Sequence, residues 1–315
     1  MKILILGFGS IGQRHARILG GQLGHDVELV TRRDAAGFRR HPSLAEAGDL
    51  GRFDYFVVAT ATHLHHRQLA ELDAEVAGRT ILVEKPLFFP ETHYGPPRNR
   101  VFVGYNLRFH PALRKARELL EGRPVAAVSV RAGEYLPWWR PGTDYRVCYS
   151  ARRAEGGGVV LDLSHEIDYV QWLFGPLTRL VSLAGHLSGL EIDSDDYASV
   201  LALTERGTAV DLTLDYLSTL PQRSMLARTR DGTVLLDLRR STVTACDSGG
   251  RREDWDFSAA DRDYSYRELH RAVLERDGLD ACTLDQGLAV LRMVRGIYSN
   301  NLLADPPADG EGPAC

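Results

Sequence analysis

The chain is poor in cysteine and has no long apolar run, and each absence argues against a class of protein. Its 315 residues include four cysteines, which lie far apart and form no C-x-x-C pair. We therefore expect neither a disulfide framework nor a metal site, and this cysteine usage fits the reducing cytoplasm. No stretch approaches the roughly 20 apolar residues that a membrane-spanning helix needs, and the apolar run at residues 2–6 is too short for a signal peptide. We expect a soluble, cytoplasmic protein with no membrane partner.

The chain also lacks an excess of basic residues. Its 38 lysines and arginines are outnumbered by 42 aspartates and glutamates, which gives a formal net charge of −4. The arginine pairs are scattered and interleaved with acids, so we expect no nucleic-acid partner. With 44% apolar and 25% charged residues the composition is that of a globular protein, and the length suffices for two packed domains.

Up to about residue 110, short apolar segments alternate with segments of helical periodicity. The predicted strands are residues 2–6, 27–30, 55–59, 80–83 and 101–105, and the predicted helices are residues 11–19, which Gly20 and Gly21 should stop, and 63–77. Residues 87–100 are too rich in proline and glycine for a full crossover helix. Strands that alternate with helices predict an α/β domain at residues 1–110, built on a doubly wound parallel sheet.

After residue 110 the pattern changes to consecutive strands with few helices between them. The predicted strands are residues 125–131, 177–184, 198–204, 209–216, 224–230 and 233–238, with closing helices at 265–276 and 284–300. Glu205-Arg206-Gly207 is a hairpin signal. Residues 111–303 are therefore predicted to form an α+β domain with a large, open, mainly antiparallel sheet. Residues 304–315, rich in proline, glycine and aspartate, are expected to be disordered.

A glycine motif connects the first predicted strand to the first helix. It reads Gly7-Phe8-Gly9-Ser10-Ile11-Gly12. Its glycines permit a tight turn, a close approach of the backbone to a pyrophosphate, and close packing of helix on strand, while the helix N-terminus offers N–H groups to phosphates. The position between a strand and a helix predicts a dinucleotide site.

The end of the second predicted strand indicates which dinucleotide binds. The chain has Thr31-Arg32-Arg33 where an NAD site usually has an acidic residue. Guanidinium groups match a 2′-phosphate in charge and geometry, and Thr31 can donate a hydrogen bond. We therefore expect NADP(H), with NAD(H) as the alternative, since Asp34 would reach the ribose after a small register shift.

Candidate catalytic residues follow in two places. Lys85, in Glu84-Lys85-Pro86, lies at the carboxyl end of a predicted parallel strand, where open α/β sheets bind ligands. Read as one helix, the segment 156–175 has an apolar stripe on one side. The other side carries Asp162, His165, Asp168, Tyr169 and Trp172. This polar side is either a solvated face or part of an active site, where a lysine and a histidine would move a proton.

In these motifs the chain resembles the Gfo/Idh/MocA family, which includes glucose–fructose oxidoreductase and inositol dehydrogenase. The resemblance rests on the glycine motif, on Ala59-Thr60-Ala61-Thr62-His63-Leu64-His65, on Glu84-Lys85-Pro86, on Gly104-Tyr105-Asn106-Leu107-Arg108-Phe109-His110-Pro111, and on the glycine-rich segment that contains Asp162 and His165. The motifs occur in the family's order up to about residue 175. The resemblance implies a Rossmann domain followed by a sheet domain for substrate binding and oligomerisation.

The resemblance also implies roles for single residues. Lys85 is the catalytic lysine, His165 donates or accepts the proton, and Asp162 supports His165. Thr60, His65, Glu84 and Lys85 lie on the cofactor side, and Asn106 lies near nicotinamide and substrate. The family commonly separates the aspartate and histidine by one residue more than here, so Asp168 is an alternative partner of His165.

A further segment predicts the substrate. Between the domains lie aromatic residues and arginines, namely Tyr135, Trp138, Trp139, Arg140, Tyr145 and Arg146. Aromatic rings pack on sugar rings and arginines bind carboxylates or phosphates, although the tryptophans are as readily explained by a loop that packs on the sheet. With Asp162, His165 and Asp168, these residues predict a site for a sugar, in a branch that resembles proteins for nucleotide-activated or acidic sugars.

Together these features predict an NADP(H)-dependent oxidoreductase that acts on a secondary alcohol or ketone of a sugar or nucleotide sugar. Two alternatives are NAD-dependent glycoside cleavage by transient oxidation and elimination, and a sensor that binds dinucleotide without turnover. We expect a homo-oligomer, a dimer or tetramer, formed through the open sheet.

Overall fold

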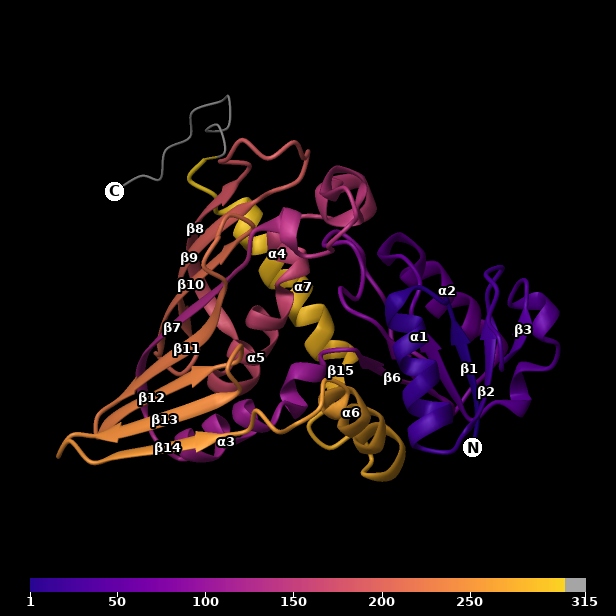
Figure 1. Ribbon diagram of the computed structural model, residues 1–315, viewed down its shortest axis with the longest axis horizontal. Coiled ribbons are helices and arrows are strands. Elements are labelled where there is room, and N and C mark those ends of the chain that lie inside the picture. Colours follow the sequence, from indigo (N-terminus) through magenta and orange to yellow (C-terminus); the bar gives the residue numbers. More distant parts are fainter. Residues whose placement is uncertain (304–315) are drawn as a thin grey trace.

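The computed structural model describes residues 1–303, which form two sheets with helices between and around them (Figure 1). Sheet A has seven strands in the order β15-β6-β5-β4-β1-β2-β3, and sheet B has eight in the order β14-β13-β12-β11-β7-β10-β9-β8. Every pair in sheet A is parallel except β15–β6, and every pair in sheet B is antiparallel except β7–β10. The predicted fold class is confirmed. The segment predicted to be disordered, 304–315, lies outside the described residues.

The inner strands of sheet A are buried on both faces. Its strands are β1 (Lys2–Leu6), β2 (Asp26–Val30), β3 (Arg39–His41), β4 (Tyr55–Val58), β5 (Thr80–Val83), β6 (Arg100–Val103) and β15 (Cys282–Thr283). Ile3 and Ile5 pack in a cluster with α1 (Ser10–Ala16) and α6 (Tyr264–Glu275), whereas Leu4 and Leu6 pack in another with α2 (Thr62–Glu75). Because successive side chains point to opposite faces, both residues of each pair are buried.

The prediction that Gly20 and Gly21 stop the first helix is wrong. After α1 the chain continues as a π-helix, Arg17–Gln22. Ile18 and Leu19 are fully buried there, and their burial outweighs the roughly 1 kcal/mol that a glycine costs in a helix. The region 87–99 contains no helix, as its proline and glycine content predicts.

Sheet B has one buried and one open face. Its strands are β7 (Val125–Gly133), β8 (Leu177–Gly185), β9 (Tyr197–Thr204), β10 (Ala209–Asp215), β11 (Gln222–Thr229), β12 (Gly232–Asp237), β13 (Thr242–Asp247) and β14 (Arg252–Asp256). On the open face Leu201 is 58% and Leu235 40% exposed. The sequence did not predict β13 and β14, because their polar, exposed residues show no clear alternation.

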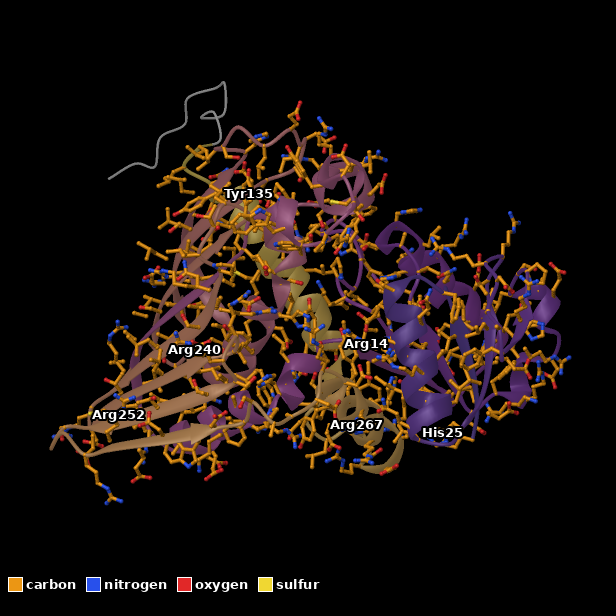
Figure 2. All side chains as sticks on the ribbon, viewed as in Figure 1. Arg14, His25, Tyr135, Arg240, Arg252 and Arg267 are labelled. Carbon is orange, nitrogen blue, oxygen red and sulfur yellow. The ribbon has the colours of Figure 1, made fainter. Side chains whose placement is uncertain are left out.

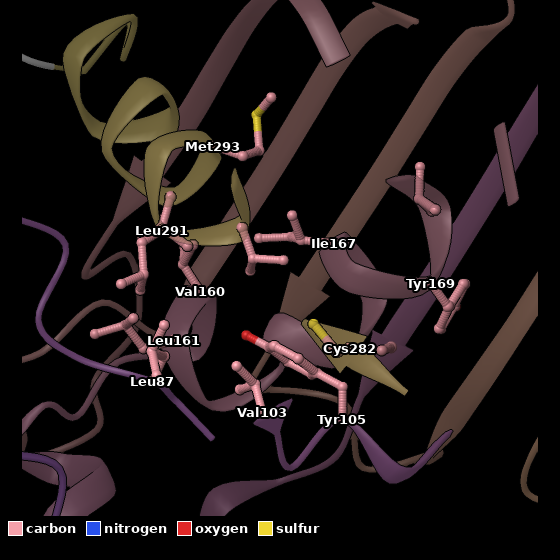
Figure 3. Packing of buried hydrophobic residues seen from close by; sticks show 14 of the residues in the cluster. Leu87, Val103, Tyr105, Val160, Leu161, Ile167, Tyr169, Cys282, Leu291 and Met293 are labelled. Carbon is pink, nitrogen blue, oxygen red and sulfur yellow. The ribbon is translucent and has the colours of Figure 1, made fainter. Parts of the chain in front are cut away.

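The buried face of sheet B packs on helices, and this core continues to sheet A. The helices are α3 (Pro111–Leu120), α4 (Val159–Asp162), α5 (Ser164–Phe174) and α7 (Leu284–Ser299). Figure 3 shows Val103, the last residue of β6, and Tyr105, two residues further along the chain, near Ile167 of α5 and Leu291 of α7. The chain also returns to sheet A through α6 and β15, so residues from both predicted domains, 1–110 and 111–303, build that layer.

The segment expected to form one helix is broken in two. α4 ends at Asp162, and Leu163, with φ −96° and ψ 26°, separates it from α5. Most of α5 is buried, including Asp168 and Tyr169, so its polar side is not a solvated face. The break moves Asp162 out of helical register with His165. Within residues 1–303 no helix is both long and apolar enough to cross a bilayer.

Candidate active site

The glycine motif forms a turn in which two of the three glycines leave no room for a side chain. Gly7 has φ +97°, and a Cβ atom there would lie 2.6 Å from the carbonyl oxygen of Ala59. A Cβ atom on Gly12 would collide with the carbonyl oxygen of Gly7, whereas one on Gly9 would meet nothing within 4 Å. Gly7 and Gly12 are therefore needed for packing, and Gly9 leaves an open approach to the backbone. Phe8 lies within this turn, and Ser10 and Ile11 begin α1.

Two arginines follow β2 without partners for their charge. Arg32 and Arg33 are exposed, and neither guanidinium group forms a hydrogen bond or ion pair among residues 1–303. Thr31 accepts the backbone N–H of Arg33 over 3.0 Å, and Asp34 accepts that of Ala35 over 3.0 Å. Both guanidinium groups remain available for an anion at the end of sheet A.

Lys85 lies at the carboxyl end of β5 and opens onto a cleft of about 420 Å³. Its Nζ donates to the backbone oxygen of Asp162 over 2.7 Å. The polar residues that line this cleft are Lys85, Glu134, Trp139, Tyr149, Asp162, His165, Gln222, Arg223 and Arg239. The structure thus brings together three predicted catalytic residues, Lys85, Asp162 and His165, from elements up to 80 residues apart.

His165 is buried at this cleft in its neutral form. Burial, and then the positive charges of Lys85 and Arg223, hold the pKa of His165 well below its ordinary value. Its Nδ1 has no hydrogen-bond partner among the described residues, and its ring packs edge-on against Tyr105 at 5.5 Å. A neutral imidazole with a free nitrogen is able to accept a proton.

Neither aspartate predicted to partner His165 does so in the structure. The Asp162 carboxylate accepts hydrogen bonds from the hydroxyl groups of Tyr149 and Tyr216 over 2.6 and 2.7 Å. Asp168 pairs instead with Arg108, whose Nε and Nη2 donate over 3.0 and 2.6 Å. Asp162 does not reach His165 because the helix breaks at Leu163 between them. Asp168 pairs with Arg108 because this buried cation compensates its charge.

Glu84 lies inside the protein rather than on the cofactor side. It accepts a hydrogen bond from Nε2 of His15 on α1 over 2.9 Å. Nδ1 of His15 contacts Nε2 of His270 at 2.8 Å, and Nδ1 of His270 contacts the hydroxyl of Tyr55 at 3.1 Å. Burial and then His15 hold the pKa of His270 well below its ordinary value. This buried chain ties α6 and the glycine helix to the residue before Lys85.

Three other residues predicted on the cofactor side form internal hydrogen bonds. Thr60 donates to Gln68 over 2.6 Å, and Asn106 donates to Ser265 over 2.7 Å. His65 is buried, with Nε2 3.1 Å from the carbonyl of Thr60 and Nδ1 3.1 Å from that of Pro86. His65 therefore connects the loops after β4 and β5 and holds the chain around Lys85.

The aromatic segment contributes one tryptophan to the cleft. Trp139 lines it, and its Nε1 donates to the carbonyl of Glu134 over 3.1 Å. Trp138 is 51% exposed and packs edge-on against Tyr135, labelled in Figure 2. Neither residue is among those that line the cleft.

Neither arginine predicted to bind an anion in this segment lines the cleft. Arg146 is exposed and pairs with Asp144 and Glu191 over 2.9 Å each. Arg140 lies over the ring of Tyr149 at 5.0 Å, but it does not line the cleft. Tyr145 contacts the backbone of Glu191. Local acids and rings, which sequence proximity alone does not reveal, hold these side chains on the surface.

Sequence reasoning missed Tyr149, Tyr216 and Arg223. Burial raises the pKa of both tyrosine hydroxyl groups well above the ordinary value, so both donate to Asp162 as neutral groups. Arg223 carries a usable signal, because it precedes buried Met225 and Ala227 at alternating positions of β11. An arginine at an inward position of a strand needs a partner or a ligand.

Fold and site together define a class: a Rossmann-type domain with a dinucleotide turn, followed by an open-sheet domain that closes a cleft around a lysine and a histidine. Residues 113–234 match the family model of the GFO/IDH/MocA C-terminal domain. The match over these residues confirms the resemblance seen in the sequence.

Individual relatives agree with this assignment. The chain is 27% identical over 236 residues to inositol 2-dehydrogenase of Acidothermus cellulolyticus, which covers 67% of this chain and 64% of the relative. Alignments to curated relatives span 36% and 64% of those proteins, less than two thirds of their length.

Solved structures resemble nearly the whole chain. UDP-N-acetylglucosamine 3-dehydrogenase GnnA from Acidithiobacillus ferrooxidans has a TM-score of 0.76 at 18% identity, covering 96% of this chain and 97% of its own. The WlbA dehydrogenase from Bordetella pertussis, solved with NADH and UDP-GlcNAcA, has a TM-score of 0.72 at 20% identity, covering 95% and 96%. At these identities the likeness establishes the shared fold.

Proposed function

We propose that the protein is an NADP(H)-dependent oxidoreductase that acts on a secondary alcohol or ketone of a sugar or nucleotide sugar. One observation carries the proposal: Lys85 and a neutral, unpartnered His165 line the same cleft. The cleft lies beyond the carboxyl end of β5, and the glycine turn lies beyond the same end of β1, which is parallel to it through β4. Ligands of open α/β sheets bind at this edge.

The relatives support the reaction class and a sugar-like substrate. One relative is named as an inositol dehydrogenase and one structural neighbour as a UDP-N-acetylglucosamine dehydrogenase. Another neighbour was solved with NADH and a UDP-sugar. Trp139, which offers an aromatic surface in the cleft, is compatible with a sugar ring.

The residues of the cleft divide the chemistry between them. A bound nicotinamide would take a hydride from the alcohol carbon or give one to the ketone carbon. Lys85 hydrogen-bonds the reacting oxygen, and His165 accepts the hydroxyl proton during oxidation and returns it during reduction. Asp162, fixed by two tyrosines, supports this pair through its backbone oxygen, which orients Nζ of Lys85.

The choice of cofactor rests on Arg32 and Arg33. Two exposed guanidinium groups without ion-pair partners in the described part of the chain suit a 2′-phosphate. Neighbours described with NAD or NADH make NAD(H) the alternative.

Titration with NADPH and NADH tests whether the protein binds a dinucleotide and which one it prefers, as the proposed function requires. We expect NADPH to bind more tightly, and Arg32→Ala to abolish the difference, while Arg179→Ala, on exposed β8, leaves it unchanged. Preference for NADH would overturn the cofactor assignment. Tightly bound NAD+ that co-purifies and is not consumed would favour oxidation and elimination instead. If neither dinucleotide binds, the proposed function is wrong.

The proposal includes a homo-oligomer, a dimer or tetramer formed through the open face of sheet B, and a location in the cytoplasm. The open face of sheet B exposes apolar side chains, including Val181 and Leu201 on the paired strands β8 and β9 and Leu235 on β12. A second copy of the chain that covers this face would remove them from water, which light scattering tests. The free thiols of Cys148, Cys246 and Cys282 suit the cytoplasm.

A further inference from the structure

Two arginines of sheet B line the cleft beside Lys85 and His165. Arg223 lies at the start of β11, and Arg239 is the second residue after the end of β12. They are close in space, because the backbone N–H of Leu238 donates to the carbonyl of Arg223 over 2.9 Å. Both side chains line the cleft of about 420 Å³. Neighbouring strands thus bring two guanidinium groups to the proposed site of proton transfer.

The guanidinium group of Arg223 is held in place by the buried carboxylate of Glu166. Its Nε and Nη2 donate to the two carboxylate oxygens of Glu166 over 2.7 and 3.0 Å. The Glu166 side chain is fully buried on α5, whereas 28% of the Arg223 side chain is exposed. This bidentate pair fixes the plane of the guanidinium group. Nη1 forms no hydrogen bond among residues 1–303 and remains available.

Arg239 is held less firmly and has more free donors. Its Nη1 donates to Glu134 over 3.2 Å, and 44% of the side chain is exposed. Its Nε and Nη2 have no partner in the part of the chain described here. Asp162 is no competitor for a cation, because two tyrosine hydroxyl groups already donate to its carboxylate. Among the residues that line the cleft, three are cationic (Lys85, Arg223 and Arg239) and two are anionic (Glu134 and Asp162).

We propose that Arg223 and Arg239 form a subsite for an anionic group of the substrate, either a carboxylate on the sugar or a phosphate attached to it. This inference deepens the proposed function and rests on it. Planar guanidinium groups recognise both oxyanions through paired N–H donors. The subsite takes over the role that the sequence suggested for Arg140 and Arg146, since neither of those side chains lines the cleft.

Calorimetry on the full chain with three probes tests this subsite. The probes are glucuronate, glucose 1-phosphate and neutral glucose, so the two anionic arms separate carboxylate from phosphate. We expect at least one anion to bind about tenfold more tightly than glucose, with an affinity that falls as salt increases. Equal binding of all three probes, or binding of none, would overturn the proposal.

Variants assign the effect to the two arginines. Arg239→Gln, on an exposed side chain, should reduce the preference for the anion about tenfold. Arg223→Gln combined with Glu166→Gln keeps a neutral hydrogen-bonded pair and should abolish the preference. Arg240→Gln is the matched control, because Arg240, labelled in Figure 2, is the next residue along the chain. Its side chain is 83% exposed and does not line the cleft. A preference that survives both test variants contradicts the proposal.

Binding of NADPH to the same variants separates this inference from the function below it. If NADPH binds and a neutral sugar is turned over in a Lys85-dependent manner without any preference for anions, only the subsite is wrong. If the anion preference is present but no dinucleotide binds, the oxidoreductase assignment fails and the subsite stands.

Discussion

The two sheets of the protein use their side chains in opposite ways. In sheet A both faces of a strand are buried, as in β4, where all four residues are inaccessible. In sheet B one face is buried and the other is open, as in β9, where buried and accessible residues alternate. Sheet A therefore has little surface for function except at its strand ends, whereas sheet B can place a functional side chain along its length.

This difference explains where the proposed site residues lie. The glycine turn, Arg32 and Lys85 all follow the carboxyl ends of strands in sheet A. Arg223 lies within a strand of sheet B, and Tyr216 directly follows another. A polar group inside a strand must be compensated locally, and Glu166 compensates Arg223 in this way. Sheet A thus contributes site residues from the loops that follow its strands, and sheet B contributes them from inward-facing side chains.

The largest effect should come from the end of a strand in sheet A. Lys85→Met should lower turnover about 10²- to 10⁴-fold, because it removes the group that hydrogen-bonds the reacting oxygen while the proton is transferred. Affinity for NADPH, measured by fluorescence titration, should stay within a few fold because the glycine turn is untouched. The chain has lysine only at positions 2, 85 and 115, so Lys115→Met is a matched control. Turnover that survives Lys85→Met would remove this residue from the mechanism.

On the sheet B side, the two hydrogen bonds from Tyr149 and Tyr216 to the Asp162 carboxylate, here called the Asp162 clamp, should contribute to the free energy of unfolding. Tyr216→Phe removes one of two hydroxyl donors to a buried carboxylate, which should lower the free energy of unfolding by about 1.5–3 kcal/mol. Denaturant titration measures the change. Tyr197→Phe is the control, since its hydroxyl forms no hydrogen bond within residues 1–303. If Asp162→Asn relieves the loss caused by Tyr216→Phe, the charge of Asp162 is the cause; if it does not, the clamp is less important than its geometry suggests.

Within the glycine turn, two substitutions should have different consequences. Gly7→Ala places a Cβ atom against Ala59 at a positive φ, so it should destabilise the fold by about 1–3 kcal/mol. Gly9→Ala meets no neighbour within 4 Å and should leave the melting temperature unchanged while weakening NADPH binding. Melting curves with and without NADPH distinguish the two. Equal loss of stability in both variants would show that Gly9 is also a packing residue.

The smallest effect should appear as a pH dependence of stability. Burial, and then Arg223, lower the pKa of His110 to about 4, and the pKa values of His165 and His270 are lowered as well. Between pH 6.5 and about 4 the unfolded chain binds protons that the folded chain does not, so stability falls as pH decreases. Each such histidine contributes a slope of up to about 1.4 kcal/mol per pH unit.

Denaturant titrations between pH 8 and 5 measure this slope. His110→Gln should reduce it, whereas the same change at exposed His93 should not. A stability that stays constant from pH 6.5 to 5 would mean that the buried histidines are charged in the folded protein.

The sequence alone determined the parts of this protein that depend on local interactions. Strands such as β1 and β5 follow from continuous apolar runs, and the turn at residues 7–12 follows from Gly7 and Gly12, where a side chain would collide with the backbone. Lys85 and His165 also came from the sequence, because short motifs mark them. The sequence did not predict the polar strands β13 and β14, because backbone pairing with the adjacent strands, rather than their composition, holds them in sheet B.

Only the tertiary structure decided which side chains meet. In the folded protein Asp162 accepts hydrogen bonds from Tyr149 and Tyr216 instead of partnering His165. Arg223, and not Arg146, lines the cleft. Buried polar groups take whatever partner compensates them, and these partners lie 13 residues away for Tyr149 and 54 for Tyr216. Such pairings depend on how two sheets pack, which no local pattern encodes.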